Sequence, residues 1–248
     1  MQEPGRARPF KIQRGPTSCL LLHGLTGTPY EMRALGEALA AADVTVYCPL
    51  LPGHGTCPED LAETGWRDWE ASAIEAFEDL NSNASQLFVC GLSMGASLAI
   101  RIAARREVAG LIALSPAIRL QSRLVPFLPI LSRLIPFRKK SSDIKDPVAK
   151  SVQPSYDRQS LAAANSLRDL LTRLPDDIRA MRAPLLVIVS RDDHVIDPEA
   201  AKRLLQEAGS DQKRIVMLED SYHVITVDRE SERVRREVVG FVQEVAGM

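Results

Sequence analysis

The stretch that most constrains the fold of this chain of 248 residues is Gly91-Leu92-Ser93-Met94-Gly95. It lies between an apolar run, residues 86–90, and a stretch of small residues with helical character, residues 96–105. A strand, Gly-x-Ser-x-Gly and a helix in this order are the context in which a nucleophile elbow forms. The glycines permit a turn so tight that a Cβ atom at either position would collide with backbone. The pattern therefore predicts a strained Ser93 with an exposed hydroxyl, at the positive end of a helix dipole.

Apolar runs and amphipathic segments alternate along much of the chain. The runs interpreted as buried strands cover residues 17–22, 44–48, 86–90, 108–114, 184–190 and 214–218. Helical spacing of apolar residues follows at residues 29–39, 66–80, 96–105, 198–208 and 234–245. The first of these helices is predicted to begin with Thr28 as N-cap, Pro29 in the first turn and Glu31 completing a capping box. The alternation favours an α/β fold, with a mostly parallel central sheet and helices on both faces.

The alternation is interrupted at residues 116–175, which are rich in proline and show no strand pattern. Active sites of open parallel sheets lie at the carboxyl ends of the strands, so we interpret this segment as an inserted cap over that edge. The alternative is a helical excursion with no role in binding. The predicted domain organisation is a core of residues 1–115 and 176–248 with a cap of residues 116–175.

The most apolar part of the predicted cap is residues 124–137. It contains seven Leu, Ile or Val residues, two Phe and three Pro. The prolines prevent one long helix, and so much apolar surface is expected to be buried against the uncovered edge of the sheet. Phe127 and Leu131 are therefore predicted to contact the apolar part of a substrate.

A serine hydroxyl needs a base to take its proton, and histidine is the usual one. The chain has four candidates, which are His23, His54, His194 and His223. His223 follows the last predicted strand, and its loop therefore opens on the same edge of a parallel sheet as Ser93. Position thus selects His223, whereas His23 ends the first strand and is better suited to shaping an oxyanion site.

The acid that orients the histidine should follow another strand. Asp192 and Asp193 both come directly after the aliphatic run of residues 184–190, and order alone leaves both open. Asp220 is nearer to His223 in sequence, but it lies in the same predicted loop as His223 and is interpreted as a turn residue. Either carboxylate of the first pair could fix the imidazole tautomer and stabilise the imidazolium.

Five motifs together resemble those of α/β-hydrolases, and more narrowly of small bacterial carboxylesterases and monoacylglycerol lipases. They are residues 23–29, 53–56, 91–95, 193–198 and 221–226, in the order of that family. The resemblance implies the α/β-hydrolase fold with a small inserted cap, and it selects Asp193 over Asp192. Ala96 departs from the family pattern, in which a third glycine is common there, and the cap matches least.

The resemblance implies a serine esterase with a triad of Ser93, His223 and Asp193. The backbone N–H groups of Leu25 and Met94 would form the oxyanion hole, and neither a cofactor nor a metal is expected. The expected substrates are carboxylic esters of short to medium acyl chains, with monoacylglycerol as a candidate. Alternatives on the same fold are a C–C bond hydrolase, an acyltransferase or a non-catalytic ligand-binding relative. Ester assays distinguish a serine esterase from the first two alternatives. Failure to react with a fluorophosphonate would favour the non-catalytic relative.

Composition excludes several other functions. The net charge of −1 gives no excess of Lys and Arg for nucleic acid. No apolar run approaches the roughly 20 residues that span a bilayer. The N-terminal residues do not resemble a secretory signal, and the four cysteines lack metal-ligand spacing, so free thiols in the cytoplasm are expected. The sequence gives no indication of the oligomeric state.

Overall fold

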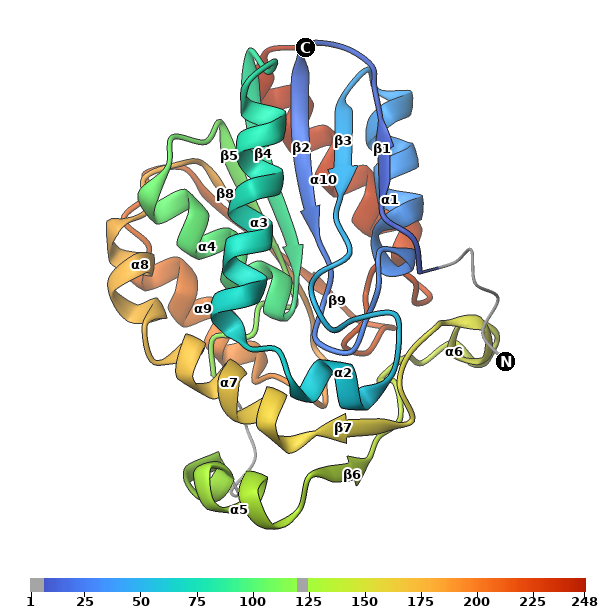
Figure 1. Ribbon diagram of the computed structural model, residues 1–248. Helices are drawn as coiled ribbons and strands as arrows, with labels where there is room; N and C mark the ends of the chain where they lie inside the picture. Colours follow the sequence, from blue (N-terminus) through green and yellow to red (C-terminus); the bar gives the residue numbers. More distant parts are fainter. Residues whose placement is uncertain (1–6, 120–124) are drawn as a thin grey trace.

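The computed structural model describes residues 7–119 and 125–248. Its central feature is a seven-stranded sheet with the strand order β1-β3-β2-β4-β5-β8-β9 (Figure 1). The strands are β1 (Phe10–Ile12), β2 (Thr17–Leu22), β3 (Thr45–Cys48), β4 (Gln86–Leu92), β5 (Gly110–Leu114), β8 (Leu185–Ser190) and β9 (Lys213–Leu218). Strand β1 pairs antiparallel with β3, and the other pairs in this sheet are parallel. The mostly parallel sheet is confirmed, whereas the three-residue edge strand β1 is too short to show a periodic pattern.

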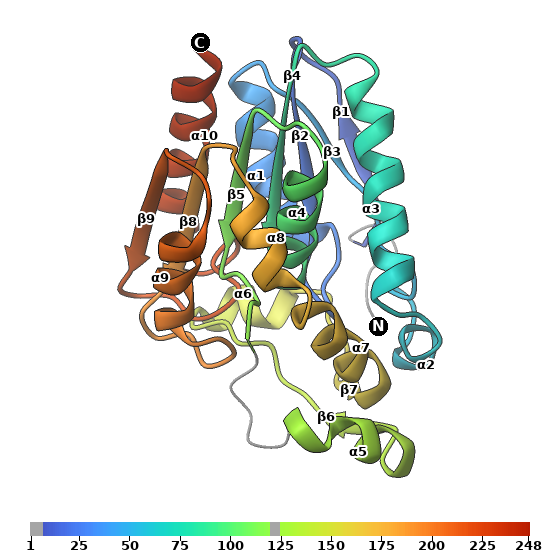
Figure 2. The ribbon, with the colours of Figure 1, turned by 90° about the vertical axis from the view of Figure 1, so that its left-hand side faces the viewer.

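Helices cover both faces of this sheet (Figures 1 and 2). One face carries α1 (Tyr30–Ala41) and α10 (Ser231–Ala246), and the other carries α3 (Trp66–Asn81), α4 (Met94–Arg105), α8 (Leu174–Ala180) and α9 (Pro198–Glu207). Strand β8 shows why both faces need cover. Its aliphatic side chains alternate between two core clusters, with Leu185, Val187 and Val189 in one and Leu186 and Ile188 in the other. A continuous apolar run is typical of a parallel strand buried on both sides.

The chain between β5 and α8 leaves the sheet and lies beyond the carboxyl ends of its strands, at the lower end of Figure 1. Its elements are η1 (Val125–Phe127), α5 (Leu128–Leu134), β6 (Phe137–Lys139), α6 (Pro147–Val152), β7 (Arg158–Ser160) and α7 (Leu161–Leu171). The prediction of no strand here is wrong, because β6 and β7 pair antiparallel. Each is three residues long and largely polar, so neither produces an alternating signal. The short helix α2 (Pro58–Ala62) lies at the same end.

The division into a core and a cap remains a prediction. Residues 1–6 of the predicted core and 120–124 of the predicted cap, including Leu124, lie outside the described residues.

The apolar stretch that follows residue 124 is only partly buried. Leu128 is buried, and Leu131 packs against the same small cluster, which includes Leu161 and Ala164 of α7. The expectation of burial is wrong for four side chains, which are 48–73% exposed: Phe127, Ile130, Leu134 and Ile135. The reason is that α5 packs chiefly on a single neighbour, α7, so only one side of this helix is covered.

The predicted capping box at the start of α1 is also wrong. Pro29 occupies the N-cap position with no side-chain cap, and the Thr28 hydroxyl has no hydrogen-bond partner among the described residues. The Glu31 carboxylate instead accepts hydrogen bonds from the Gly24 N–H at 3.3 Å and from Gln153 Nε2 at 2.5 Å. Tertiary contacts of the Glu31 side chain therefore replace the capping interaction that the local sequence pattern predicts.

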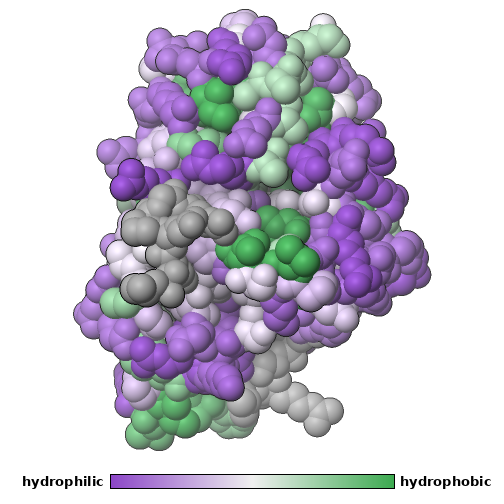
Figure 3. Space-filling model, turned by 90° about the vertical axis from the view of Figure 1, so that its right-hand side faces the viewer, coloured by the Kyte–Doolittle hydropathy of each residue, from purple (hydrophilic) through white to green (hydrophobic). Residues whose placement is uncertain are grey.

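The surface turned to the viewer in Figure 3 is mainly hydrophilic, with apolar side chains gathered near its centre and at its lower end. Within residues 7–119 and 125–248, no helix is both long and apolar enough to cross a membrane.

Candidate active site

Ser93 sits at a sharp turn between the end of β4 and the start of α4, with φ 55° and ψ −115°. Glycine is required on both sides of it. A Cβ on Gly91 would lie 2.2 Å from the carbonyl carbon of Gly95, and one on Gly95 would lie 2.1 Å from the carbonyl oxygen of Leu22. The Ser93 N–H donates to the Leu114 carbonyl at 2.9 Å, which ties the turn to β5. A non-glycine residue at positive φ costs on the order of 1–3 kcal/mol, and such strain is typical of a functional site.

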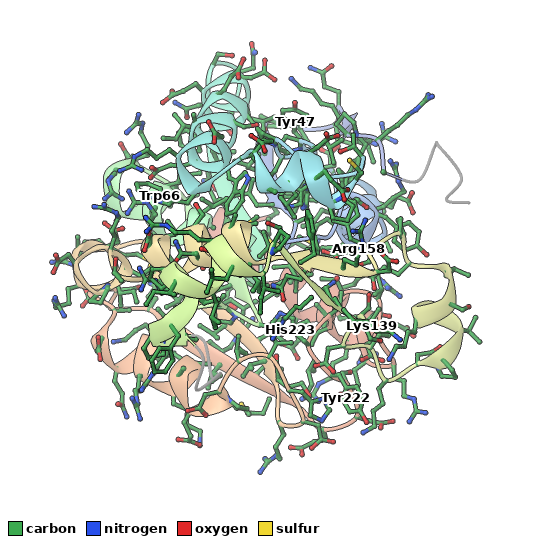
Figure 4. The ribbon with its side chains drawn as sticks, turned by 60° about the horizontal axis from the view of Figure 1, so that its bottom comes forward. Tyr47, Trp66, Lys139, Arg158, Tyr222 and His223 are labelled. Carbon is green, nitrogen blue, oxygen red and sulfur yellow. The ribbon has the colours of Figure 1, made fainter. Side chains whose placement is uncertain are left out.

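The three predicted triad residues come together at the carboxyl ends of β4, β8 and β9. His223 Nε2 lies 2.8 Å from the Ser93 Oγ, and His223 Nδ1 lies 2.7 Å from Asp193 Oδ2. Asp192 is elsewhere, with half of its side chain exposed and one oxygen 3.2 Å from Lys145 Nζ. In Figure 4, which views this end of the molecule, His223 lies near the centre and its neighbour Tyr222 nearer the rim.

The Asp193 carboxylate is held by its own loop. Its Oδ1 accepts hydrogen bonds from the N–H groups of Val195 at 2.8 Å and Ile196 at 2.9 Å, and its side chain has no exposed surface. Because Oδ1 is engaged in this way, Oδ2 is aimed at the imidazole. A carboxylate in this position fixes the histidine tautomer, with Nδ1 protonated and Nε2 free to accept the serine proton.

The electrostatic surroundings of His223 favour its protonated form. Burial lowers the pKa of the imidazole, but the charges and hydrogen bonds of its neighbours outweigh burial and the net shift is upward. Asp193 contributes most to the increase, followed by Asp143 and Glu31. The site therefore stabilises the imidazolium that a general base becomes after it takes a proton.

The predicted oxyanion donors flank Ser93. Met94 is the first residue of α4, so its N–H has no acceptor within the helix. Leu25 lies in the loop after β2, and a Cβ on the preceding Gly24 would lie 3.5 Å from the Ser93 Cβ, so this loop passes directly beside the serine. Thr26 has φ 66°, which marks the loop as strained. We retain the assignment of these two N–H groups to an oxyanion hole as a proposal.

His23 and His54 are buried, and the hydrogen bonds of their rings go to backbone groups of Gly24, Leu51 and Pro52 and not to Ser93. Burial first, and then the neighbouring His54, lowers the pKa of His23 to about 3, while burial lowers that of His54 to about 4. The neutral His23 ring donates from Nδ1 to the Gly24 carbonyl at 3.0 Å and accepts at Nε2 from the Leu51 N–H at 3.1 Å. It thus joins residues 23–29, which we call the oxyanion loop after their proposed role, to the loop after β3.

Phe127 and Leu131 do not have an established place in the site. Phe127 is 57% exposed, and Leu131 belongs to the small cluster between α5 and α7. The cluster that Leu131 packs against includes none of the triad residues, and contact of either side chain with substrate remains a proposal. The described residues also contain no group of three or more His, Cys, Asp or Glu side chains suited to a metal ion.

Two acidic residues beside the site were missed by sequence reasoning. Glu31 is buried behind the oxyanion loop, and burial raises the pKa of its carboxyl despite the opposing Gly24 N–H, Lys140, His223 and Gln153. The sequence does hold one clue to Glu31, because an acidic residue there falls on the buried face of the predicted helix, beside Met32. Asp143, in the segment between β6 and α6, contacts both the loop after β8 (residues 191–197, the acid loop) and the loop after β9 (residues 219–230, the histidine loop), and nothing in its sequence context indicates this.

Known proteins match this chain over most of its length. The family described as serine aminopeptidase, S33, matches residues 16–230. A thermostable monoacylglycerol lipase of Bacillus sp. (strain H-257) is 34% identical over 97% of this chain and 96% of its own length. A carboxylesterase of Bacillus subtilis (strain 168) is 27% identical over 96% of this chain and 97% of its own.

Solved structures also resemble this chain over nearly its whole length. A structure from a study of LipS and LipT, two metagenome-derived lipolytic enzymes, superposes with a TM-score of 0.92 and 30% identity, covering 97% of this chain and 98% of the other. A monoacylglycerol lipase of Paleococcus ferrophilus has a TM-score of 0.81 at 24% identity, over 96% and 98% of the two chains, and supports the fold alone. This chain therefore belongs to the serine aminopeptidase S33 family and has the α/β-hydrolase fold.

Proposed function

We propose that this chain hydrolyses esters of short to medium acyl chains through an acyl-enzyme on Ser93, with His223 as general base and Asp193 as its orienting acid. The observation that carries the proposal is the pair of hydrogen bonds from Ser93 Oγ to His223 Nε2 at 2.8 Å and from His223 Nδ1 to Asp193 Oδ2 at 2.7 Å. A nucleophile, a base and an orienting carboxylate in one line are the signature of an activated serine.

The chain is a carboxylic ester hydrolase, as are the monoacylglycerol lipase and the carboxylesterase that match nearly its whole length. Their names support two substrate classes for this chain. Simple carboxylic esters are the broader class, and monoacylglycerols are the narrower candidate. The acyl-chain preference and the choice between these classes belong to the proposal.

The first half of the reaction forms the acyl-enzyme. His223 Nε2 takes the hydroxyl proton of Ser93 as Oγ attacks the ester carbonyl carbon, and the carbonyl electron pair moves onto oxygen. The N–H groups of Leu25 and Met94 donate hydrogen bonds to this oxyanion, at the positive end of α4. Collapse of the tetrahedral intermediate breaks the bond to the alcohol oxygen, which receives the proton from His223.

The second half returns the free enzyme. His223 takes a proton from water, and the hydroxide attacks the acyl carbon to form a second oxyanion in the same place. Collapse breaks the bond to Ser93 Oγ, which regains its proton from His223, and the carboxylic acid leaves. Asp193 holds the imidazole in one orientation through both halves.

A substrate panel tests this proposal. The panel contains p-nitrophenyl esters of increasing chain length, monoacylglycerols, and amino-acid p-nitroanilides, since the family description names an aminopeptidase. Turnover of the esters with a burst of p-nitrophenol supports the acyl-enzyme. Turnover of the anilides alone, or of neither class, contradicts the proposal.

A further inference from the structure

A single carboxylate outside the triad joins the acid loop to the histidine loop. Asp143 Oδ2 accepts hydrogen bonds from the backbone N–H of His223 and from that of His194, both at 3.2 Å. Its Oδ1 lies 2.9 Å from His194 Nδ1. His194 directly follows Asp193, so one side chain from the proposed cap bonds to both of the loops that supply the acid and the base.

The backbone of Asp143 and of the residues after it is bonded to the histidine loop at two points. Its carbonyl accepts a hydrogen bond from the Val224 N–H at 3.1 Å. Further along the same segment, the buried Asp228 carboxylate accepts from the N–H groups of Lys145 at 2.8 Å and Asp146 at 2.9 Å. We call residues 143–146 the strap, because they cross from the acid loop to the histidine loop.

The strap also carries a cation between the same two loops. Lys145 Nζ lies 3.2 Å from an oxygen of Asp192 in the acid loop and 2.9 Å from one of Asp220 in the histidine loop. These carboxylates are half exposed, so the ion pairs are worth little by themselves. Asp143 is more shielded, with 18% of its side chain exposed, and it is the strap side chain that bonds to the backbone of His223.

We propose that Asp143 is a positioning residue for the reaction, which clamps the backbone of His223 to the acid loop and stabilises the protonated imidazole by its charge. The inference rests on the proposed function, since it takes His223 to be the base. His223 comes from the loop after β9 and Asp193 from the loop after β8, and the clamp fixes the distance between those loops. A displacement of about 1 Å in a catalytic group can cost on the order of 100-fold in rate.

The effect of the Asp143 charge on the imidazole can be separated from its hydrogen bonds to the two loops, because the charged groups around His223 are known. Asp193 faces it from the acid loop, Asp143 from the strap and Glu31 from α1, and all three raise the pKa of the imidazole against the effect of burial. On the cationic side, the largely buried Lys140 lies near Glu31, and Lys145 is engaged by Asp192 and Asp220. Removal of the Asp143 charge alone should therefore lower the pKa of His223.

Two substitutions of Asp143 divide the role. In Asp143→Asn the amide oxygen still accepts from both backbone N–H groups, but the charge is lost. This variant should lower kcat at high pH by a smaller factor than Asp143→Ala does, because only the charge that stabilises the imidazolium is lost, and the acid limb of its kcat/KM profile should move to lower pH. Asp143→Ala loses the clamp as well, and its kcat should fall by about 10- to 100-fold at every pH with a smaller change in KM.

Asp146→Ala is the matched control from the same strap. The Asp146 carboxylate caps α6 by accepting from the N–H groups of Val148 and Ala149, and it makes no hydrogen bond to the histidine loop in the described part of the chain. Loss of a helix cap costs about 1 kcal/mol. Asp146→Ala should therefore lower Tm while kcat and the pH profile stay as in the parent enzyme.

A measurement that does not depend on turnover completes the test. In a Ser93→Ala background, the His223 ring signals are followed by NMR as a function of pH, with and without Asp143→Asn, and are assigned by their loss in His223→Ala. The inference predicts that the imidazole titrates at lower pH when Asp143 is Asn. This result can be obtained even if Asp143→Ala does not fold.

The outcomes distinguish the inference from the function on which it rests. If the parent enzyme hydrolyses esters and Ser93→Ala does not, the proposed function stands. If both Asp143 variants then behave like Asp146→Ala, with a lower Tm but unchanged kcat, pH profile and His223 titration, the positioning role is refuted. If the parent enzyme neither hydrolyses esters nor reacts with a fluorophosphonate, the proposed function fails, and the positioning role falls with it.

Discussion

The hydroxyl of Ser93 and Nε2 of His223 lie 2.8 Å apart although 130 positions separate them in the sequence. The parallel sheet explains their meeting. Strands β4 and β9 run in the same direction, so the loops after them open on one edge, and the elbow glycines bring the serine hydroxyl to that edge. Asp193 lies at the same edge for the same reason, because it is in the loop after the parallel strand β8.

Asp193→Asn and Asp192→Asn form a matched pair that tests the acid. Asp193 lies 2.7 Å from His223 Nδ1, so its substitution should lower kcat by about 10³- to 10⁴-fold through the wrong imidazole tautomer. Asp192 bonds to Lys145 instead, and Asp192→Asn should keep kcat within about threefold. Steady-state kinetics at saturating ester decides between them, and an inactive Asp192→Asn variant would show that the acid is misassigned.

The dependence of activity on pH follows from the sign of the His223 shift. The pKa of this imidazole is raised, so the protonated form, which cannot act as a base, persists to higher pH than in a free histidine. Activity should therefore be lost on acidification with a midpoint above the ordinary value of about 6.5. The measurement is kcat/KM for one ester from pH 5 to 9, and a flat profile would count against a histidine base.

Gly95→Ala tests the elbow. The added Cβ would lie 2.1 Å from the Leu22 carbonyl oxygen and 2.7 Å from that of His23, and these are backbone atoms with little room for relaxation. We expect a loss of at least about 1–3 kcal/mol in the free energy of unfolding, as for overpacking of a core.

Gly240 in α10 provides the control for that substitution. Among the described residues, no atom outside its own stretch of helix lies within 4 Å of the position that its Cβ would take. Gly240→Ala should therefore stabilise the protein by about 0.5–1 kcal/mol, because alanine is the better helix former. Urea denaturation measures both changes, and a well-folded, fully active Gly95→Ala variant would refute the steric account of the turn.

Chain-length preference tests the proposed cap. Leu131→Ala and Phe127→Ala should change the ratio of kcat/KM between short and long acyl esters by tenfold or more, since one methylene in an apolar pocket is worth about 1–3 kcal/mol. Leu134→Ala is the control, because 73% of Leu134 is exposed. Truncations that leave the ratio unchanged in well-folded variants would reduce the stretch to packing between α5 and α7.

Much of the core could be predicted from sequence because the apolar runs are long and separated by helical periods. The short elements could not. Strands β6 and β7 have three residues each and pair across a long loop, so no local pattern marks them. The prediction of a capping box is wrong because of contacts that are distant in sequence. The Glu31 carboxylate bonds to Gln153 and to the oxyanion loop instead.

The site shows the same limit. Chain order placed Ser93 and His223 on one edge, but it could not distinguish adjacent aspartates, and only the resemblance favoured Asp193. The structure separates the two by their partners, which are His223 for one and Lys145 for the other. Asp143 could not be found at all, because its role depends on how a proline-rich segment crosses two loops distant in sequence.

The covalent step at Ser93 tests the account most directly. The protein is incubated with a fluorophosphonate, and the modified residue is identified by peptide mass spectrometry, with Ser93→Ala in parallel. The account predicts a single adduct on Ser93, no adduct in the variant, and a loss of kcat of about 10⁴-fold or more in Ser93→Ala. Ester hydrolysis that persists at the parent rate in Ser93→Ala, or an adduct on another residue, would contradict it.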